Sequence, residues 1–90
     1  MDKKLRLHII APDTKLKKSP PETADMVVIP CSTGELGVLP GRLPCTMVLG
    51  NGMLRVTTGD ETVQFKVNGG LATVSGDVVT VLANELKALY

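Results

Sequence analysis

Hydrophobic and polar positions alternate along several short stretches of the chain. Apolar side chains occupy every second position in residues 5–9, and the same spacing returns in residues 63–67. This period of two predicts β-strands with one buried face. No stretch shows a sustained helical period. The expected strands cover residues 5–9, 14–18, 24–29, 36–39, 46–49, 53–58, 63–67, 71–74 and 78–83.

Turns that contain glycine separate these stretches. Residues 50–52 read Gly-Asn-Gly, and their Asn-Gly pair predicts a hairpin with a type I′ turn. Residues 59–60 and 76–77, both Gly-Asp, predict two further turns. Pro40-Gly41 suits the centre of a type II turn, where glycine supplies a positive φ. About nine short strands at this spacing predict an all-β sandwich or barrel.

Three segments depart from simple alternation. Residues 24–29 form an apolar run with adjacent β-branched residues, which predicts a strand buried on both faces, and Pro30 is expected to end it. Residues 68–70, Asn-Gly-Gly, are expected to interrupt a strand before alternation resumes. Asn84 is a suitable helix cap, so the pattern permits a helix start there, although residues 84–90 are too few to hold a helix alone.

The composition excludes several classes of protein. The chain has 90 residues, enough for one domain with a thin core. Aromatic residues make up 2% and the net charge is +1, which argues against aromatic stacking platforms and electrostatic attraction of nucleic acid. The apolar runs are far shorter than the roughly 20 residues of a membrane-spanning helix, and residues 1–5 lack a signal-peptide core. We therefore expect a cytoplasmic domain that does not insert into a membrane.

The charged residues are distributed unevenly along the chain, and its two cysteines do not form a metal-binding motif. Residues 1–18 carry six basic and two acidic side chains, whereas residues 19–90 carry four basic and seven acidic ones. The basic Lys15–Lys18 run fits either an acidic partner or an edge strand protected by lysines. Cys31 and Cys45 lack a C-x-x-C spacing, and a single histidine leaves a zinc site without ligands. We expect two reduced, structural thiols.

The sequence contains no catalytic constellation. His8 alternates with apolar residues and has no acid or nucleophile nearby in the sequence, so we expect an exposed strand histidine rather than a general base. The chain lacks a P-loop, a dinucleotide-binding glycine motif and a nucleophile elbow. Asp13, Asp60 and Asp77 each lie beside a turn, where their carboxylates are expected to bond nearby backbone amides.

Residues 34–44 form the most distinctive segment. It holds Glu35 and Arg42 in a stretch stiffened by Pro40, Pro44 and three glycines, with leucines between the charges. Rigid loops lose less entropy on binding, but stiff loops also arise for packing. The residues alone leave a core-covering role and a partner-docking role open.

The same segment carries a family resemblance. Gly34–Gly41 reads G-E-L-G-V-L-P-G and closely resembles the G-E-[LF]-G-[IV]-L-P-G-H signature of the epsilon subunit of bacterial F-type ATP synthases. Six ordered matches to the family cover nearly the whole chain, which is far more specific than any one of them. Besides the signature, the matches lie at residues 5–12, 24–30, 52–56, 68–74 and 79–83.

The resemblance implies a small flattened β-sandwich of two sheets, with residues 1–84 as the epsilon-type domain and residues 85–90 as a short tail that starts the family's helical region. It implies a non-catalytic central-stalk subunit that turns with the gamma subunit and couples ion flow to ATP synthesis. The implied partners are gamma, the polar loops of the c-ring and, indirectly, the alpha/beta assembly, at the cytoplasmic face of the bacterial membrane. No cofactor, metal, nucleotide or catalytic residue is implied. The c-ring-facing positions carried over are Gly34, Glu35, Leu36, Gly37, Pro40, Gly41 and Arg42.

The chain also departs from the family pattern. Arg42 stands where the family usually has histidine, so a permanent cation replaces a titratable group. Family members usually continue into a two-helix domain that binds ATP in some bacteria, and we expect no ATP site in this chain. The alternative is a carrier module of the lipoyl or biotinyl type, whose modified lysine the expected hairpin tips lack. A small enzyme has no constellation to support it.

Overall fold

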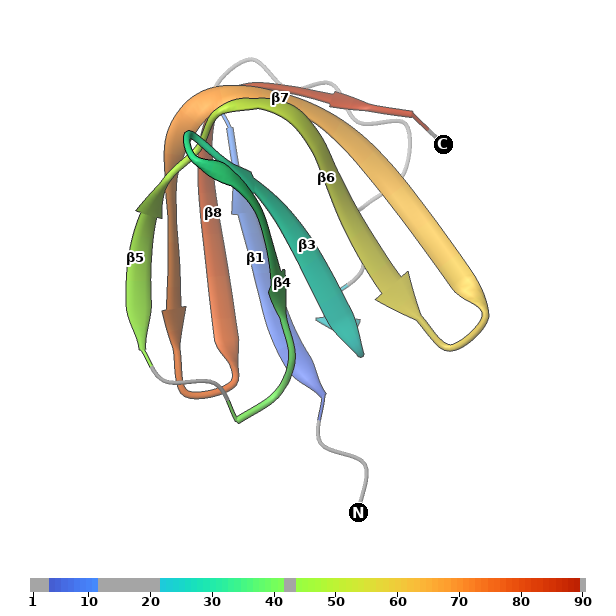
Figure 1. The fold of residues 1–90 in the computed structure, drawn as a ribbon. Helices are drawn as coiled ribbons and strands as arrows, with labels where there is room; N and C mark the ends of the chain where they lie inside the picture. The colour runs from blue at the N-terminus through green and yellow to red at the C-terminus, as the bar shows by residue number, and fades with distance from the viewer. Residues whose placement is uncertain (1–3, 12–21, 42–43, 90) are drawn as a thin grey trace.

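The computed structural model describes residues 4–11, 22–41 and 44–89, and every regular element within these ranges is a β-strand (Figure 1). The all-β prediction is confirmed, with eight strands in the described residues. The expected strand at residues 14–18 lies outside them. The strands are β1 (Leu5–Ile10), β2 (Thr23–Ala24), β3 (Met26–Cys31), β4 (Gly34–Val38), β5 (Cys45–Val48), β6 (Asn51–Thr58), β7 (Glu61–Ser75) and β8 (Val78–Ala88).

Two long strands, β7 and β8, bend and take part in both layers of a sandwich. The strand order is β2-β1-β8-β7-β6-β3-β4, and β5 pairs with the second half of β7. One layer therefore holds β5, the second half of β7, the first half of β8, β1 and β2. The other layer holds the remaining halves of β7 and β8 with β6, β3 and β4 (Figure 1). The molecule measures 36 × 27 × 18 Å, so the predicted flattened shape is confirmed.

Glycine makes the bend in β7. Gly69 and Gly70 have φ values of 74° and 124°, in the region that side chains rarely adopt. A Cβ on Gly70 would lie 2.0 Å from the carbonyl oxygen of Leu82, because β8 pairs with β7 here and places Ala83 opposite Gly70. The Asn-Gly-Gly segment thus folds one strand over, and the two strands expected at residues 63–67 and 71–74 are one.

The core lies between the two layers and is aliphatic apart from Phe65. Along β1, Leu5 and Leu7 are buried while Arg6 and His8 are exposed, as their alternation predicts. The fully buried side chains of greatest volume are Phe65, Leu5, Ile29, Leu54, Val27, Val38, Val56, Val67, Val74, Val79 and Val81.

The prediction for β3 is wrong in two respects. The strand is not buried on both faces, because Val27 and Ile29 are buried whereas Met26 and Val28 are only partly covered. It also continues through Pro30 to the following residue. On the edge of β3 that faces β6, only residues 26–28 are paired. The missing N–H of Pro30 therefore costs no ladder hydrogen bond to β6.

Residues 50–52 do not form the predicted hairpin. The preceding strand β5 pairs with β7, and β6 already starts at Asn51, so this segment carries the chain from one layer to the other. Its glycines permit close approach rather than a positive φ. A Cβ on Gly50 would lie 3.0 Å from the Cys31 carbonyl oxygen, and a Cβ on Gly52 would lie 2.9 Å from the Cβ of Pro30.

The helix start at Asn84 is also wrong, since β8 continues to Ala88. The first half of β7 offers an open edge there, and residues 85–88 pair with it in antiparallel register.

The other turn predictions hold: Gly41, Gly59 and Gly76 have φ values of 84°, 59° and 60°. The residues that the structure describes contain no helix long and apolar enough to cross a membrane.

Candidate functional site

The segment with the distinctive sequence is half strand and half loop. Residues 34–38 form β4, which pairs with β3 as a hairpin, rather than the shorter strand expected at residues 36–39. Val38 is buried and Leu36 packs against the core, so this side of β4 belongs to the sandwich. Glu35 and Gly37 lie on the exposed side. The segment therefore both covers the core and offers a surface.

Glu35 is held by a residue that sequence reasoning did not single out. Its Oε2 accepts from Arg55 Nη2 at 2.7 Å, and the two side chains are 54% and 43% exposed, respectively. Both strands flank β3, where Pro30 pairs with Glu35 and Val28 with Arg55. Only this register brings the two charges together, because they are 20 positions apart. Arg42, expected to act beside Glu35, lies outside the described residues.

The loop after β4 is fixed to a distant turn. Asp77 Oδ1 accepts from the backbone amide of Gly41 at 3.1 Å, and the Asp77 carbonyl accepts from the Arg6 amide at 2.7 Å. The carboxylate was expected to bond amides near its own turn, and it joins two turns instead. Leu39, in the same loop, is 57% exposed. We call residues 39–41 and 76–77 the loop end of the sandwich.

A row of exposed aliphatic side chains crosses the outer face of the β5-containing layer. Register places Ile10 beside Leu82, Leu82 beside Leu71, and Leu71 beside Val48. The four side chains are between 44% and 57% exposed, although each is large and apolar. At the usual strand spacing the row is about 14 Å long. We call these four residues the outer apolar row. A contiguous exposed patch of this kind typically marks a protein–protein contact.

A polar row runs beside the outer apolar row. The same registers place His8, Thr80, Thr73 and Thr46 side by side, two positions along each strand. In the next row, Arg6 pairs with Val78, and Val78 with Ser75. Among the described residues of these rows, Arg6 is the one permanent charge. An apolar strip with hydroxyl groups at its side resembles the core and rim of a protein interface.

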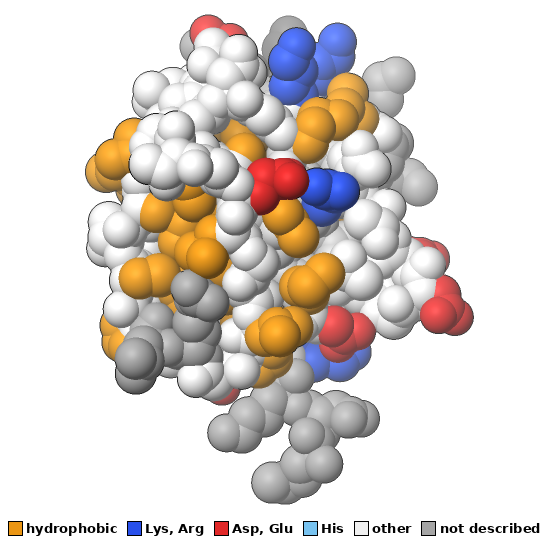
Figure 2. All heavy atoms as spheres, in the orientation of Figure 1, with side chains coloured by type: hydrophobic (Ala, Val, Ile, Leu, Met, Phe, Trp, Pro, Cys, Tyr) orange, Lys and Arg blue, Asp and Glu red, His pale blue; other side chains and the backbone are white. Residues whose placement is uncertain are grey.

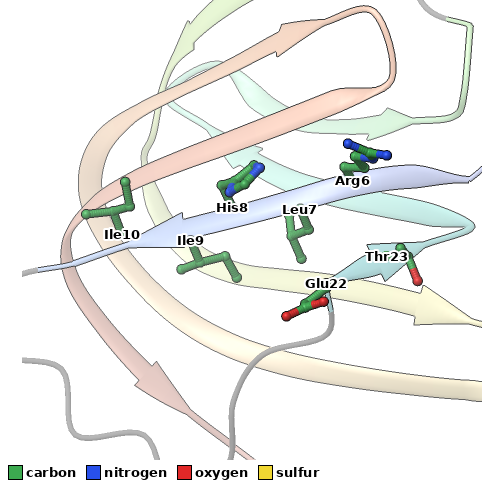
Figure 3. A pocket seen from close by; sticks show the side chains of 7 residues that line it. All are labelled: Arg6, Leu7, His8, Ile9, Ile10, Glu22 and Thr23. Atoms are coloured by element: carbon green, nitrogen blue, oxygen red, sulfur yellow. The ribbon is translucent and has the colours of Figure 1, made fainter.

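His8 does not meet an acid in the cavity beside β1. This cavity, of about 660 Å³, is lined by both faces of the strand and by Glu22 and Thr23. Figure 3 shows His8 and Arg6 on one side of β1 and Glu22 on the other, next to Leu7. The described lining residues thus form no histidine–carboxylate pair. His8 is exposed, as expected for a strand histidine.

Comparison with known proteins identifies the family. The model of the family "ATP synthase, Delta/Epsilon chain, beta-sandwich domain" matches residues 4–88. The chain belongs to this family, and the carrier-module alternative is set aside. The match extends past residue 84, in agreement with the strand that continues to Ala88.

Curated relatives are similar over most of this chain. An ATP synthase epsilon chain of Synechococcus elongatus is 41% identical over 83 residues, which cover 92% of this chain and 58% of that protein. An ATP synthase epsilon chain of Granulibacter bethesdensis is 39% identical over 82 residues, which cover 90% of this chain and 58% of that protein. The chain thus spans little more than half the length of these relatives.

Solved structures share the fold. A chain of the Euglena gracilis mitochondrial ATP synthase, in a structure of OSCP, F1 and c-ring, superposes with a TM-score of 0.82 at 28% identity, covering 96% of this chain and 54% of that chain. A chain from the central stalk and c-ring of the Tetrahymena thermophila mitochondrial enzyme superposes with a TM-score of 0.70 at 15% identity, covering 94% and 66%. The second likeness concerns the fold alone.

Proposed function

We propose that this chain is a non-catalytic central-stalk subunit of an F-type ATP synthase, which joins the gamma subunit to the c-ring during rotary ATP synthesis. The outer apolar row is the observation that carries the proposal, because it is a contiguous exposed surface in a domain without a convergent reactive site among its described residues. Membership of the ATP synthase delta/epsilon beta-sandwich family and likeness to chains of ATP synthase complexes support it. In this proposal the chain lies peripherally at the cytoplasmic face of a bacterial membrane, as part of the F1 complex.

In this proposal the outer apolar row docks on gamma. Leu71 and Leu82 are the two central residues of the row, on the inner strands β7 and β8, and the flanking threonines form a polar rim. Burial of a large aliphatic side chain stabilises a complex by about 1.5–3 kcal/mol from full exposure, so half-exposed leucines contribute roughly half of that each. Interface energy usually concentrates in such central residues.

The loop end and the exposed side of β4 face the c-ring in the same proposal. Arg55 holds the Glu35 carboxylate, and Asp77 holds the amide of Gly41, so both polar groups are oriented before a partner arrives. Preorganised groups lose less entropy on binding. Gly34, Gly37 and Pro40 shape this surface, Leu36 anchors it to the core, and Arg42 completes the proposed contact.

Binding to isolated cognate gamma tests the proposal, with Leu82→Asn and Leu39→Asn as matched variants. Both change one exposed leucine, but only Leu82 belongs to the outer apolar row. We expect Leu82→Asn to weaken gamma binding at least about tenfold, a loss of about 1.4 kcal/mol. Leu39→Asn should keep the wild-type affinity for gamma and weaken association with the c-ring. Equal affinities of the two variants for gamma would contradict the docking surface, and absence of gamma binding by the wild-type chain would contradict the function.

A further inference from the structure

Three sulfur-containing side chains, those of Cys31, Cys45 and Met47, line one cavity where the end of β3 meets β5. The thiol of Cys31 lies 3.3 Å from Met47 Sδ, although the two residues are 16 positions apart. Cys45 is two residues before Met47 on β5, so both side chains point to the same face of that strand. All three are partly buried and pack against the core. None of them is part of the outer apolar row or of the loop end.

The backbone fixes this arrangement. Cys31 forms an isolated bridge with Leu49, and the Ser32 amide donates to the Val48 carbonyl at 3.1 Å. The Gly50 amide donates to the Pro30 carbonyl at 2.9 Å. These contacts bind the end of β3 to β5 independently of the sulfur atoms. The sulfur ligands are therefore placed by the fold before anything binds to them.

The sulfur atoms border an open cavity of about 410 Å³ between β4 and β5. Figure 2 shows hydrophobic side chains reaching the surface on the side of the molecule that carries β5. Among the described residues that line the cavity, Glu35 is the one charged side chain, and its carboxylate is already paired with Arg55. The attraction for a cation therefore has to come from the sulfur atoms rather than from this carboxylate.

Both cysteines are free thiols. Burial raises the pKa of Cys31 above its ordinary value, and the charge of Cys45 raises it further. A soft cation that binds as a thiolate complex displaces the thiol proton, so its binding releases acid.

We propose that Cys31, Cys45 and Met47 form a three-sulfur site for a soft monovalent cation of the copper(I) class. Thiolate and thioether ligands select copper(I), whereas magnesium and calcium prefer oxygen and structural zinc takes four ligands from thiolate, imidazole and carboxylate. Two sulfur atoms bound to one ion at about 2.3 Å each lie at most about 4.6 Å apart. The separation of 3.3 Å between Cys31 and Met47 satisfies this limit.

Competition with a chromogenic copper(I) chelator, under argon and with the reduced chain, tests the site. The informative variant is Met47→Leu, which conserves volume, and Met53→Leu on β6 is its matched control. We expect the wild-type chain to bind one copper(I), and Met47→Leu to weaken binding at least about tenfold, the scale on which even outer partners of metal sites act. Cys45→Ser should weaken it further, and Met53→Leu should match wild type.

Two results would overturn the proposal. One is wild-type chain that takes no copper(I) from the chelator, and the other is equal affinity of Met47→Leu and Met53→Leu. A zinc titration in parallel should show weaker binding than copper(I), and the opposite order would also overturn it. Far-ultraviolet circular dichroism of each variant confirms that the sheet is intact. The outcome is independent of gamma binding, because no residue of the outer apolar row is changed.

Discussion

The Asp77 carboxylate accepts a hydrogen bond from the backbone amide of Gly41 at 3.1 Å, across 36 positions of sequence. The bond joins the loop after β4 to the turn between β7 and β8, and so fixes the loop end of the sandwich. An equivalent Gly-Asp pair occurs at residues 59–60, but the prediction that Asp60 bonds a nearby amide is wrong, because the Gly59 amide donates to Asp25 Oδ2 at 2.7 Å instead. The two turns therefore provide a matched comparison within one chain.

We predict that Asp77→Ala destabilises the chain more than Asp60→Ala does. Loss of a hydrogen bond to a carboxylate at an exposed site should lower the free energy of unfolding by about 1 kcal/mol, against a few tenths for the control. Urea denaturation measures both. Exchange of the Gly41 amide with solvent, followed by NMR, should accelerate only in Asp77→Ala. Unchanged protection of that amide would contradict the assigned contact.

Gly70 should be among the least replaceable residues. We predict that Gly70→Ala lowers the free energy of unfolding by about 3 kcal/mol or more, because its φ of 124° is strained for alanine and its Cβ would meet the Leu82 carbonyl. Gly37→Ala is the control, since a Cβ there meets nothing within 4 Å. Denaturant unfolding of both variants measures the difference. A Gly70→Ala chain as stable as Gly37→Ala would refute the bend as described.

The ion pair of Glu35 and Arg55 should contribute modestly to stability. Both side chains are partly exposed, so we predict a coupling free energy of about 0.5 kcal/mol that shrinks in high salt. A double-mutant cycle with Glu35→Gln and Arg55→Met measures it. A coupling free energy of zero at low salt would contradict a stabilising ion pair between Glu35 and Arg55.

Much of the fold was predictable because local signals agreed with it. Alternation located β1 and β6 closely, and glycine in Gly-Asp turns located two hairpins. The failures arose where tertiary pairing outweighed local signals. Residues 50–52 look like a hairpin, but β5 finds its partner in β7. Asn84 looks like a helix cap, but the open edge of β7 extends β8 past it.

The candidate site was only partly predictable. The signature segment located Glu35 and Gly41, yet nothing in their neighbourhood pointed to Arg55 or Asp77 as their partners. The outer apolar row was equally hidden, because its members come from four strands. Each looks like an ordinary strand residue, and only the registers among β1, β8, β7 and β5 align them.

The free energy of unfolding should decrease in alkaline solution. The pKa of Cys31 is raised above its ordinary value of 9.0, first by burial and then by the charge of Cys45. A raised thiol pKa means that the folded state favours the protonated form. The contribution of the Cys31 thiol to the free energy of unfolding is therefore complete below pH 9.0 and declines as pH rises through the folded-state pKa. Urea unfolding at pH 7 and 10 should show a steeper loss for wild type than for Cys31→Ser. Parallel losses would contradict the linkage.

The docking of gamma on the outer apolar row is the central claim, and methyl NMR of the Ile, Leu and Val side chains tests it most directly. On addition of gamma, the account predicts that the methyl signals of Ile10, Val48, Leu71 and Leu82 shift or broaden first, while those of Leu39 and Leu89, equally exposed but outside the row, stay in place. Perturbation of Leu39 and Leu89 with an unchanged row would contradict it.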